Sequence, residues 1–226
     1  MEKRGLAHNL AAALTAPAPA PAVAENPAVE APALTAPAPA VVGATPASLT
    51  GSVLFCDEMR LGLHGQVRRV WAPVGEKVEQ VMQIVYRWTY LLLAVDPVEG
   101  RLTWSWVTHM KGAVLAPVMA AWKAAGASAV VLDNAPGHRN PVLKAVAPPL
   151  VPLPPYSPEL DPAERIFRAL RPEIEGEAYA TLDAKRERAD AWLRALAADP
   201  ARLRALTGWT WLVEQVATAQ AAASAA

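Results

Sequence analysis

The sequence of 226 residues contains a single cysteine, Cys56, so no disulfide bond can form within the chain. It also contains no uninterrupted run of about 18 strongly apolar residues, the length expected of a membrane-spanning helix. The first absence fits a reducing compartment and the second argues against insertion in a membrane. From these two absences we predict a cytoplasmic protein with no membrane partner.

Several catalytic signatures are missing as well. There is no glycine-rich phosphate-binding loop and no Gly-x-Ser-x-Gly element, so nucleotide hydrolysis and serine-hydrolase chemistry lack support. The formal net charge is zero, whereas a dedicated duplex-DNA binder usually carries a basic excess. Neutrality argues against tight autonomous DNA binding. It does not argue against catalysis on DNA, because a carboxylate-rich metal site itself lowers the net charge.

Residues 1–49 differ in composition from the rest of the chain. Alanine alternates with proline in residues 15–22 (TAPAPAPA) and again in residues 35–40 (TAPAPA). Proline disfavours helix and alanine buries little area, so we predict a disordered or polyproline-like segment. A secretory signal is the alternative, because basic residues precede a short apolar stretch at residues 10–14. That stretch is too short and the prolines too dense for a typical signal.

The remaining sequence alternates between strand-like and helix-like patterns. Strands are expected at residues 52–56, within 66–71 and 78–95, and at 101–107, 129–132 and 150–153. Helices are expected at residues 112–126, from 161 to about 170, at 181–198 and at 200–206. This order predicts an α/β domain with a partly parallel sheet over residues 50–212, followed by an alanine-rich tail at 213–226.

Acidic residues follow two of the predicted strands. Asp57 comes directly after the apolar residues 53–56, and Asp133 comes after residues 130–132. Ligands gather at the carboxyl ends of such strands, and converging carboxylates bind Mg²⁺ or Mn²⁺. A pair of these ions can activate the attacking oxygen and stabilise the leaving oxygen in phosphoryl transfer. For either aspartate alone, a solvated turn or a helix cap is the commoner role.

Glu164 and His138 are further candidates, each with an ordinary structural alternative. In Asp161-Pro162-Ala163-Glu164 the proline suits the first helical position and Glu164 the third, which is a capping-box pattern with Asp161 as the cap. A residue of the first helical turn can still point into a cleft. His138 follows Asp133 and Asn134 in the segment DNAPGH. Such a histidine is more often a polar loop residue, but near a phosphate cleft it can position water or substrate.

These candidates fall within three sequence blocks that are informative together. The blocks are residues 55–63 (FCDEMRLGL) followed by 69–75 (RVWAPVG), residues 131–138 (VLDNAPGH), and residues 153–164 (LPPYSPELDPAE). Together they resemble the mariner-like bacterial insertion-sequence transposases of the DDE endonuclease superfamily. The third block is the most specific, and Leu206-Thr207-Gly208 resembles the tail of such proteins. The resemblance covers about residues 53–211.

The resemblance implies a ribonuclease-H-like fold, with a mixed sheet flanked by helices, in which Asp57, Asp133 and Glu164 form a catalytic triad. These residues would bind Mg²⁺ or Mn²⁺, as two ions, with Asn134 and His138 in support. The implied reaction is hydrolysis at a transposon end, followed by attack of the freed 3′-hydroxyl on target DNA. The implied partners are double-stranded DNA and a second copy of the chain in a homodimer on DNA. The candidate phosphate contacts, which are otherwise ordinary solvated surface, are Arg60, Arg68, Arg69, Arg87 and Lys111.

Two departures from the family pattern leave alternatives open. The alanine–proline segment stands where such transposases carry helix-turn-helix modules that recognise transposon ends. Asp133 and Glu164 are 31 positions apart (164 − 133), slightly closer than usual. The alternatives are a catalytically silent remnant and a structure-selective nuclease that stops at hydrolysis. An interaction protein built on the proline-rich arm would require the three blocks to be coincidental.

Overall fold

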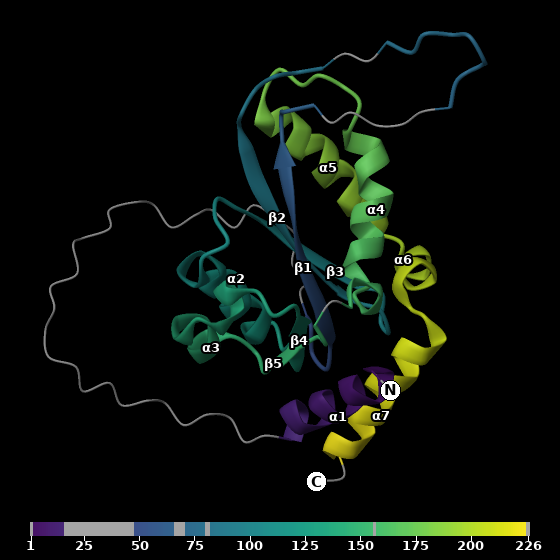
Figure 1. Cartoon of the computed structure of the whole chain (residues 1–226). Helices are drawn as coiled ribbons and strands as arrows, with labels where there is room; N and C mark the ends of the chain where they lie inside the picture. The colour runs from purple at the N-terminus through teal and green to yellow at the C-terminus, as the bar shows by residue number, and fades with distance from the viewer. Residues whose placement is uncertain (1, 16–47, 66–70, 80–81, 156, 225–226) are drawn as a thin grey trace, which may run out of the picture.

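The computed structural model describes residues 2–15, 48–65, 71–79, 82–155 and 157–224. Five strands form one sheet in the order β3-β2-β1-β4-β5 (Figure 1). They are β1 (Val53–Gly62), β2 (Trp88–Asp96), β3 (Arg101–Val107), β4 (Ala129–Leu132) and β5 (Leu150–Pro152). The pairs β1–β2 and β2–β3 are antiparallel, while β1–β4 and β4–β5 are parallel. The sheet is therefore mixed, as the predicted fold class requires.

Helices cover both faces of this sheet and its β5 end. They are α1 (Glu2–Thr15), α2 (Gly112–Ala124), α3 (Pro141–Val146), α4 (Ala163–Ile174), α5 (Leu182–Ala197), α6 (Pro200–Thr207) and α7 (Thr210–Ser224). Two short 3₁₀ turns, η1 (Pro136–Arg139) and η2 (Pro158–Leu160), lie in the connections. Local sequence explains several helix starts: the Thr181 side chain accepts a hydrogen bond from the Ala184 amide, and the Asp199 side chain accepts one from the Arg202 amide.

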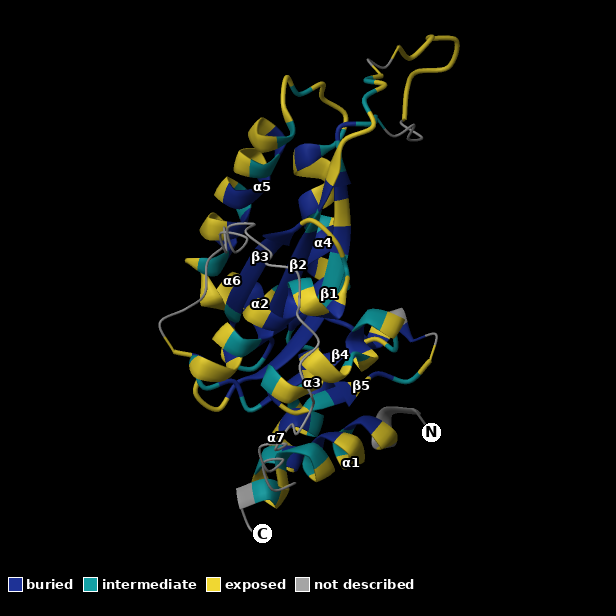
Figure 2. Ribbon diagram, turned by 90° about the vertical axis from the view of Figure 1, so that its left-hand side faces the viewer, coloured by how far each residue is buried: buried dark blue, intermediate teal, exposed yellow. Residues whose placement is uncertain are grey.

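The alternation of side chains along β1 divides the interior into two apolar cores. Val53 and Phe55 face the core that contains α4 and α5, whereas Leu54 and Cys56 face the core that contains α2 and α3. The strands are accordingly buried between helices on either side (Figure 2). Because consecutive residues of β1 point to opposite faces, Asp57 and Glu58 project to opposite sides of the sheet.

The strand prediction is wrong in one region of the chain. Residues 78–95 were expected to be largely extended strand, but β2 begins only at Trp88. The expected strand within residues 66–71 falls mostly outside the described ranges, and Trp71 is not in a strand. A turn lies between these two segments, with the Glu76 amide bonded to the Pro73 carbonyl at 3.1 Å. Apolar and β-branched residues form a ladder only where a partner strand lies alongside.

The N-terminal residues also correct the sequence prediction. Residues 2–15 form helix α1 rather than part of a disordered alanine–proline segment, and Leu6 and Leu10 are fully buried on α7 and the sheet end. This stretch precedes the first proline, Pro17, and places leucines four residues apart on one helical face. Residues 16–47, which hold the alanine–proline repeats, lie outside the described ranges.

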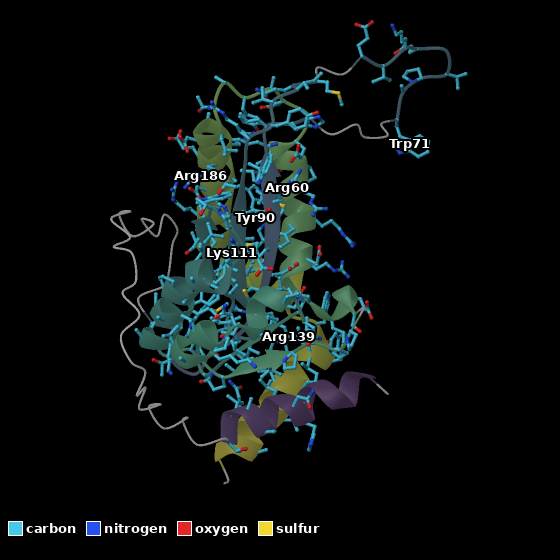
Figure 3. All side chains as sticks on the ribbon, turned by 60° about the vertical axis from the view of Figure 1, so that its left-hand side comes forward. Arg60, Trp71, Tyr90, Lys111, Arg139 and Arg186 are labelled. Carbon is cyan, nitrogen blue, oxygen red and sulfur yellow. The ribbon has the colours of Figure 1, made fainter. Side chains whose placement is uncertain are left out.

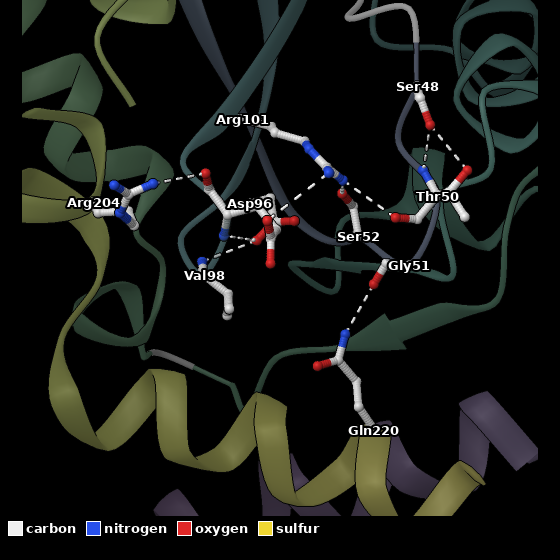
Figure 4. Close-up of polar contacts among 10 residues, drawn as sticks. Ser48, Thr50, Gly51, Ser52, Asp96, Val98, Arg101, Arg204 and Gln220 are labelled. Atoms are coloured by element: carbon white, nitrogen blue, oxygen red, sulfur yellow. Dashed lines mark hydrogen bonds and ion pairs between the residues drawn. The ribbon is translucent and has the colours of Figure 1, made fainter. Parts of the chain in front are cut away.

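The predicted boundary at residue 212 is not a structural boundary, because α7 runs through it. Val216 and Ala219 of this helix are buried. Figure 4 shows how the helix is fastened to the start of β1: Gln220 Nε2 donates to the Gly51 carbonyl at 2.9 Å. Nearby, Arg101 Nη1 donates to the Ser52 hydroxyl at 2.9 Å. In the part of the chain that the structure describes, no helix has the length and apolarity needed to cross a membrane.

Candidate active site

Asp57 and Asp133 lie on neighbouring strands at the point where β4 ends. The parallel pairing of β1 with β4 ends at Cys56↔Leu132, so the two aspartates are the next residue of each strand. Neighbouring strands lie about 4.8 Å apart, which makes their side chains neighbours. Asp57 was predicted to follow the end of its strand. It lies within the strand instead, because β1 continues beyond it and pairs it with Leu93 of β2. The longer antiparallel partner thus holds the Asp57 backbone on a rigid ladder.

The first turn of α4 brings two more carboxylates to the same place. Asp161 is buried, and its Oδ1 accepts a hydrogen bond from the Ala163 amide at 2.9 Å. The predicted cap assignment is wrong by one residue, because α4 begins at Ala163 and Pro162 occupies the N-cap position. Glu164 lies in the first turn of the helix. Asp57, Asp133, Asp161 and Glu164 all line one cavity of ≈ 790 Å³. The structure therefore brings the three predicted site residues together and adds Asp161, which the sequence had indicated only as a cap.

Burial and like charges raise the pKa of Asp57 to about 7. Burial is the largest cause, and the charges of Glu58, Glu164 and Asp133 add to it. A hydrogen bond from the Glu58 amide to Asp57 Oδ1, at 2.8 Å, acts in the opposite direction. The pKa of Asp161 is also raised well above its usual value, first by burial and then by the charge of Asp57. Carboxylates that repel one another in this way would be stabilised by a bound cation.

His138 joins Asp133 to a carboxylate on the other face of β1. Its Nδ1 lies 2.8 Å from Asp133 Oδ1, and its Nε2 lies 2.7 Å from Glu58 Oε1. Burial alone would lower the pKa of His138, but the hydrogen bond and charge of Glu58, together with Asp133, outweigh it and raise the pKa to about 9. A charged imidazolium between two carboxylates holds Asp133 in one orientation. Sequence reasoning missed Glu58, although strand alternation next to Asp57 could have indicated it.

The donor set suits a hard divalent cation, although the side chains are not gathered around one point. Among the described residues, no group of three or more His, Cys, Asp or Glu side chains is arranged to hold an ion. One reason is that Asp133 Oδ1 is already engaged by His138 and by the Ala135 amide, at 2.9 Å. The cavity nevertheless offers only carboxylate oxygens as charged ligands, with no thiol, and such oxygens are what Mg²⁺ and Mn²⁺ prefer.

Comparison with known proteins identifies the family. The family model described as "DDE superfamily endonuclease" matches residues 52–185, more than half of the chain. The chain belongs to the DDE endonuclease superfamily. This membership confirms the resemblance indicated by the three sequence blocks. No curated protein matches the sequence.

Solved structures of Mos1 transposase share the fold of this DDE endonuclease domain. The paired-end complex with the left transposon end has a TM-score of 0.56 and 14% identity, over 76% of this chain and 55% of that chain. The pre-cleavage transpososome has a TM-score of 0.57 and 14% identity, over 76% and 56%. The mariner paired-end complex with Mn has the same TM-score and identity, over 76% and 55%. The likeness shows the ribonuclease-H-like fold, and the matching region spans only about half of the Mos1 chains.

Asn134, which the sequence analysis gave a supporting role, lines the carboxylate cavity and supports its wall. Its Nδ2 donates to the Leu153 carbonyl at 2.7 Å, which ties the segment after β4 to the segment after β5. Arg139, which sequence reasoning did not single out, also lines this cavity. Helix α1 contributes Gly5 and Asn9. The rim is therefore assembled from segments distant in sequence, including residues that precede the alanine–proline repeats.

The predicted phosphate contacts divide into two groups. Arg87 and Lys111 line a second hollow, away from the carboxylates, and the Arg60 guanidinium lies 5.1 Å from the centre of the Trp88 ring there. Figure 3 shows Arg60 and Lys111 along the same part of the sheet, with Arg139 apart from them toward α1. The other two candidates, Arg68 and Arg69, lie outside the described residues.

Proposed function

We propose that this chain is the catalytic domain of a DNA transposase, in which Asp57, Asp133 and Glu164 hold divalent metal ions for DNA cleavage and strand transfer. The observation that carries the proposal is the convergence of these three carboxylates on one cavity in a chain of the DDE endonuclease superfamily. Mos1 structures bearing the same fold were obtained with Mn and with Mg, which supports a divalent metal here. We infer two ions, because phosphoryl transfer has an attacking and a leaving oxygen to stabilise.

Each residue has a distinct task in this proposal. Asp57 presents a ligand from the rigid β1 ladder, and Asp133 presents one from the adjacent strand end, oriented by His138 and Glu58. Asp161 anchors the start of α4, so that Glu164 stays at the cavity. Bound ions would polarise the attacking oxygen and neutralise charge on the leaving one. Because the carboxylates offer only oxygen atoms, the site favours hard cations such as Mg²⁺ and Mn²⁺ over metal ions that prefer sulfur or nitrogen ligands.

The proposed reaction has two phosphoryl-transfer steps. Water attacks the phosphodiester at a transposon end, the P–O bond to the 3′ oxygen breaks, and a 3′-hydroxyl is freed. That hydroxyl then attacks a target phosphodiester, so one P–O bond forms as another breaks and no covalent protein–DNA intermediate is needed. The substrate is double-stranded DNA, in the cytoplasm predicted from the sequence. A homodimer follows from the need to hold two transposon ends, and the Mos1 structures are themselves described as paired-end complexes.

A catalytically silent remnant is the second candidate function. One observation favours it: the described side chains do not form a ready-made group of three metal ligands. The presence of all three carboxylates at one cavity favours the active domain instead. Rotation of Asp133 Oδ2 toward Asp57, with Oδ1 still bonded to His138, would reconcile the two observations.

The test is Mn²⁺-dependent nicking of supercoiled DNA by the whole chain, next to Asp133→Ala and the surface control Asp183→Asn. We expect nicking by the unaltered chain and by the control, and a loss of at least about 1000-fold in Asp133→Ala, the scale of losing a catalytic ligand. Joined products with labelled end DNA would separate a transposase from a nuclease that only hydrolyses. A folded chain that binds no Mn²⁺ in calorimetry and cuts no DNA would establish the silent remnant.

A further inference from the structure

We propose that a second groove, on the opposite face of β1 from Asp57, binds an unpaired stretch of DNA by stacking its bases on aromatic side chains and pairing its phosphates with basic ones. The groove has a volume of ≈ 820 Å³. Its lining includes Tyr86, Arg87, Trp88, Tyr90, His109 and Lys111. These residues come from the start of β2 and from the segment between β3 and α2. The inference rests on the proposed function only for the identity of the ligand as DNA.

The groove exists because the sheet is longer than the helices that cover this face. Arg60 pairs with Tyr90, and Gly62 pairs with Trp88, near the far end of the β1–β2 ladder. The same face carries Leu92 nearer the middle of the sheet, where it is buried against the core that contains α2 and α3. Beyond that core the face is open, and Figure 3 shows Arg60, Tyr90 and Lys111 along it.

The aromatic side chains here are unusually accessible. Trp88 is 48% exposed and Tyr86 is 73% exposed, whereas Trp104 and Trp122 of the same domain are almost fully buried. A tryptophan beside a core would normally be covered, since burying its ring is strongly favourable. The Arg60 guanidinium, 5.1 Å from the Trp88 ring centre, covers part of it with a cation. An exposed ring flanked by arginine is the arrangement that stacks a nucleic-acid base while the cation contacts a phosphate.

The charges of the groove are all of one sign. Arg87 and Lys111 line it, and no acidic residue does. Among the ion pairs of the described residues, none involves Arg60, Arg87 or Lys111. In a chain whose formal net charge is zero, unpaired cations grouped around exposed rings are complementary to a polyanion with flat faces. A neutral protein partner would not require this charge pattern.

The occupant is unpaired rather than duplex DNA, because the bases of a duplex already stack on one another and offer no free face. Its position suits a strand next to the site of cutting. Arg60 is three residues along β1 from Asp57, which is roughly 10 Å at the rise of an extended strand. If the two DNA strands separate near the carboxylate cavity, the unpaired nucleotides would therefore reach the groove within a few nucleotides of the site of cutting.

The test measures the affinity of the chain for fluorescein-labelled oligothymidine by fluorescence anisotropy, without divalent metal. An oligonucleotide of about 15 nucleotides has a length that suits one such groove. We expect Trp88→Ala to weaken binding about tenfold, the size of one lost base stack, and Trp88→Phe to restore most of it. Replacing Arg87 and Lys111 together by glutamine should reduce the magnitude of the negative slope of log affinity against log salt by about 1.4. Arg202→Gln, an exposed arginine on α6, should change neither quantity.

Several outcomes would overturn the inference. Unchanged affinity in a folded Trp88→Ala chain would exclude stacking, and equally tight binding of a duplex with the same dependence on Trp88 would exclude an unpaired occupant. Light scattering that shows Trp88→Ala dissociating an oligomer, with oligothymidine affinity unchanged, would assign the groove to contacts between copies. Asp133→Ala should bind oligothymidine like the unaltered chain. A failure of nicking with normal oligonucleotide binding would therefore count against the proposed function and leave this inference intact.

Discussion

The carboxylate cavity and the aromatic groove are built on the same strand, yet they have opposite chemistry. Asp57 faces α4 and lies among carboxylates, whereas Arg60, three residues later, faces the other side and lies over Trp88. The strand's alternation separates them, since residues an odd number of positions apart point to opposite faces. One β-strand therefore has an acidic cavity on one face and a basic, aromatic groove on the other.

This contrast shows why a net charge of zero describes neither surface. The total counts acidic residues that repel DNA in the same sum as basic residues that attract it. Once the acids are gathered in one cavity, the groove on the opposite face can be locally basic. Association with a polyanion depends on the local field within about a Debye length, roughly 8–10 Å, rather than on the sum over the chain.

The largest effect that we expect from a change in the carboxylate cavity is an increase in the free energy of unfolding when Asp57 is replaced. Its folded pKa of about 7 exceeds the ordinary aspartate value of 3.8, so the metal-free chain loses stability as pH rises from the lower value through the higher one. Asp57→Asn should therefore raise the free energy of unfolding at pH 8.5 by on the order of 2 kcal/mol. The gain should shrink at pH 5, where Asp57 is protonated in the folded state.

Urea unfolding in EDTA at both pH values measures this gain. Asp183→Asn, which alters an exposed aspartate on α5, serves as the control and should show little change at either pH. The comparison would break if Asp57→Asn were no more stable than the unaltered chain at pH 8.5. In that event neither burial nor the neighbouring carboxylates would disfavour the charged form of Asp57 in solution, and the argument that the cavity is stabilised by a cation would lose its physical basis.

Local sequence was sufficient to predict the elements that carry the site. Val130, Val131 and Leu132 indicated a buried strand before Asp133, and Asp161-Pro162 indicated the start of α4; both are present in the structure. Such signals work because strand burial and helix capping depend on residues adjacent in sequence. The register that places Asp57 next to Asp133 depends on pairing across the sheet and could be expected only from the family resemblance.

The contacts that sequence reasoning missed join residues far apart in the chain. Glu58 and His138 are 80 positions apart, and no local pattern links them. Helix α1 was hidden by the composition of the alanine–proline repeats that follow it, although Leu6 and Leu10 have helical spacing. The open groove was hidden because exposure of Trp88 depends on where α2 stops covering the sheet. A tryptophan in a strand pattern is otherwise expected to be buried.

A smaller effect is expected from Glu58, which lies on the groove side of β1 but acts on the carboxylate cavity through His138. Glu58→Gln removes the charge that holds His138 against Asp133 while retaining a hydrogen-bonding group. We expect Mn²⁺ affinity to fall about tenfold, the low end for partners that orient a metal ligand. Glu187→Gln, an exposed position on α5, should leave the affinity unchanged.

Calorimetric titration with Mn²⁺ measures the affinity directly, and circular dichroism checks that Glu58→Gln is folded. If Glu58 had only a structural role, its replacement would lower the melting temperature without changing Mn²⁺ affinity in the folded state. A normal affinity would thus show that Asp133 is oriented without help from the other face of the strand. The two faces of β1 would then be independent.

The smallest expected effect is that of Arg60, which tests the independence of the two surfaces from the groove side. Arg60→Gln leaves the Trp88 ring in place and removes one cation, so oligothymidine affinity should fall about threefold, with a salt slope lower by about 0.7. Mn²⁺ affinity should not change, because Arg60 points away from the carboxylates. Anisotropy and calorimetry on the same preparation measure both quantities. A change in Mn²⁺ affinity would mean that the two charged surfaces interact through the sheet.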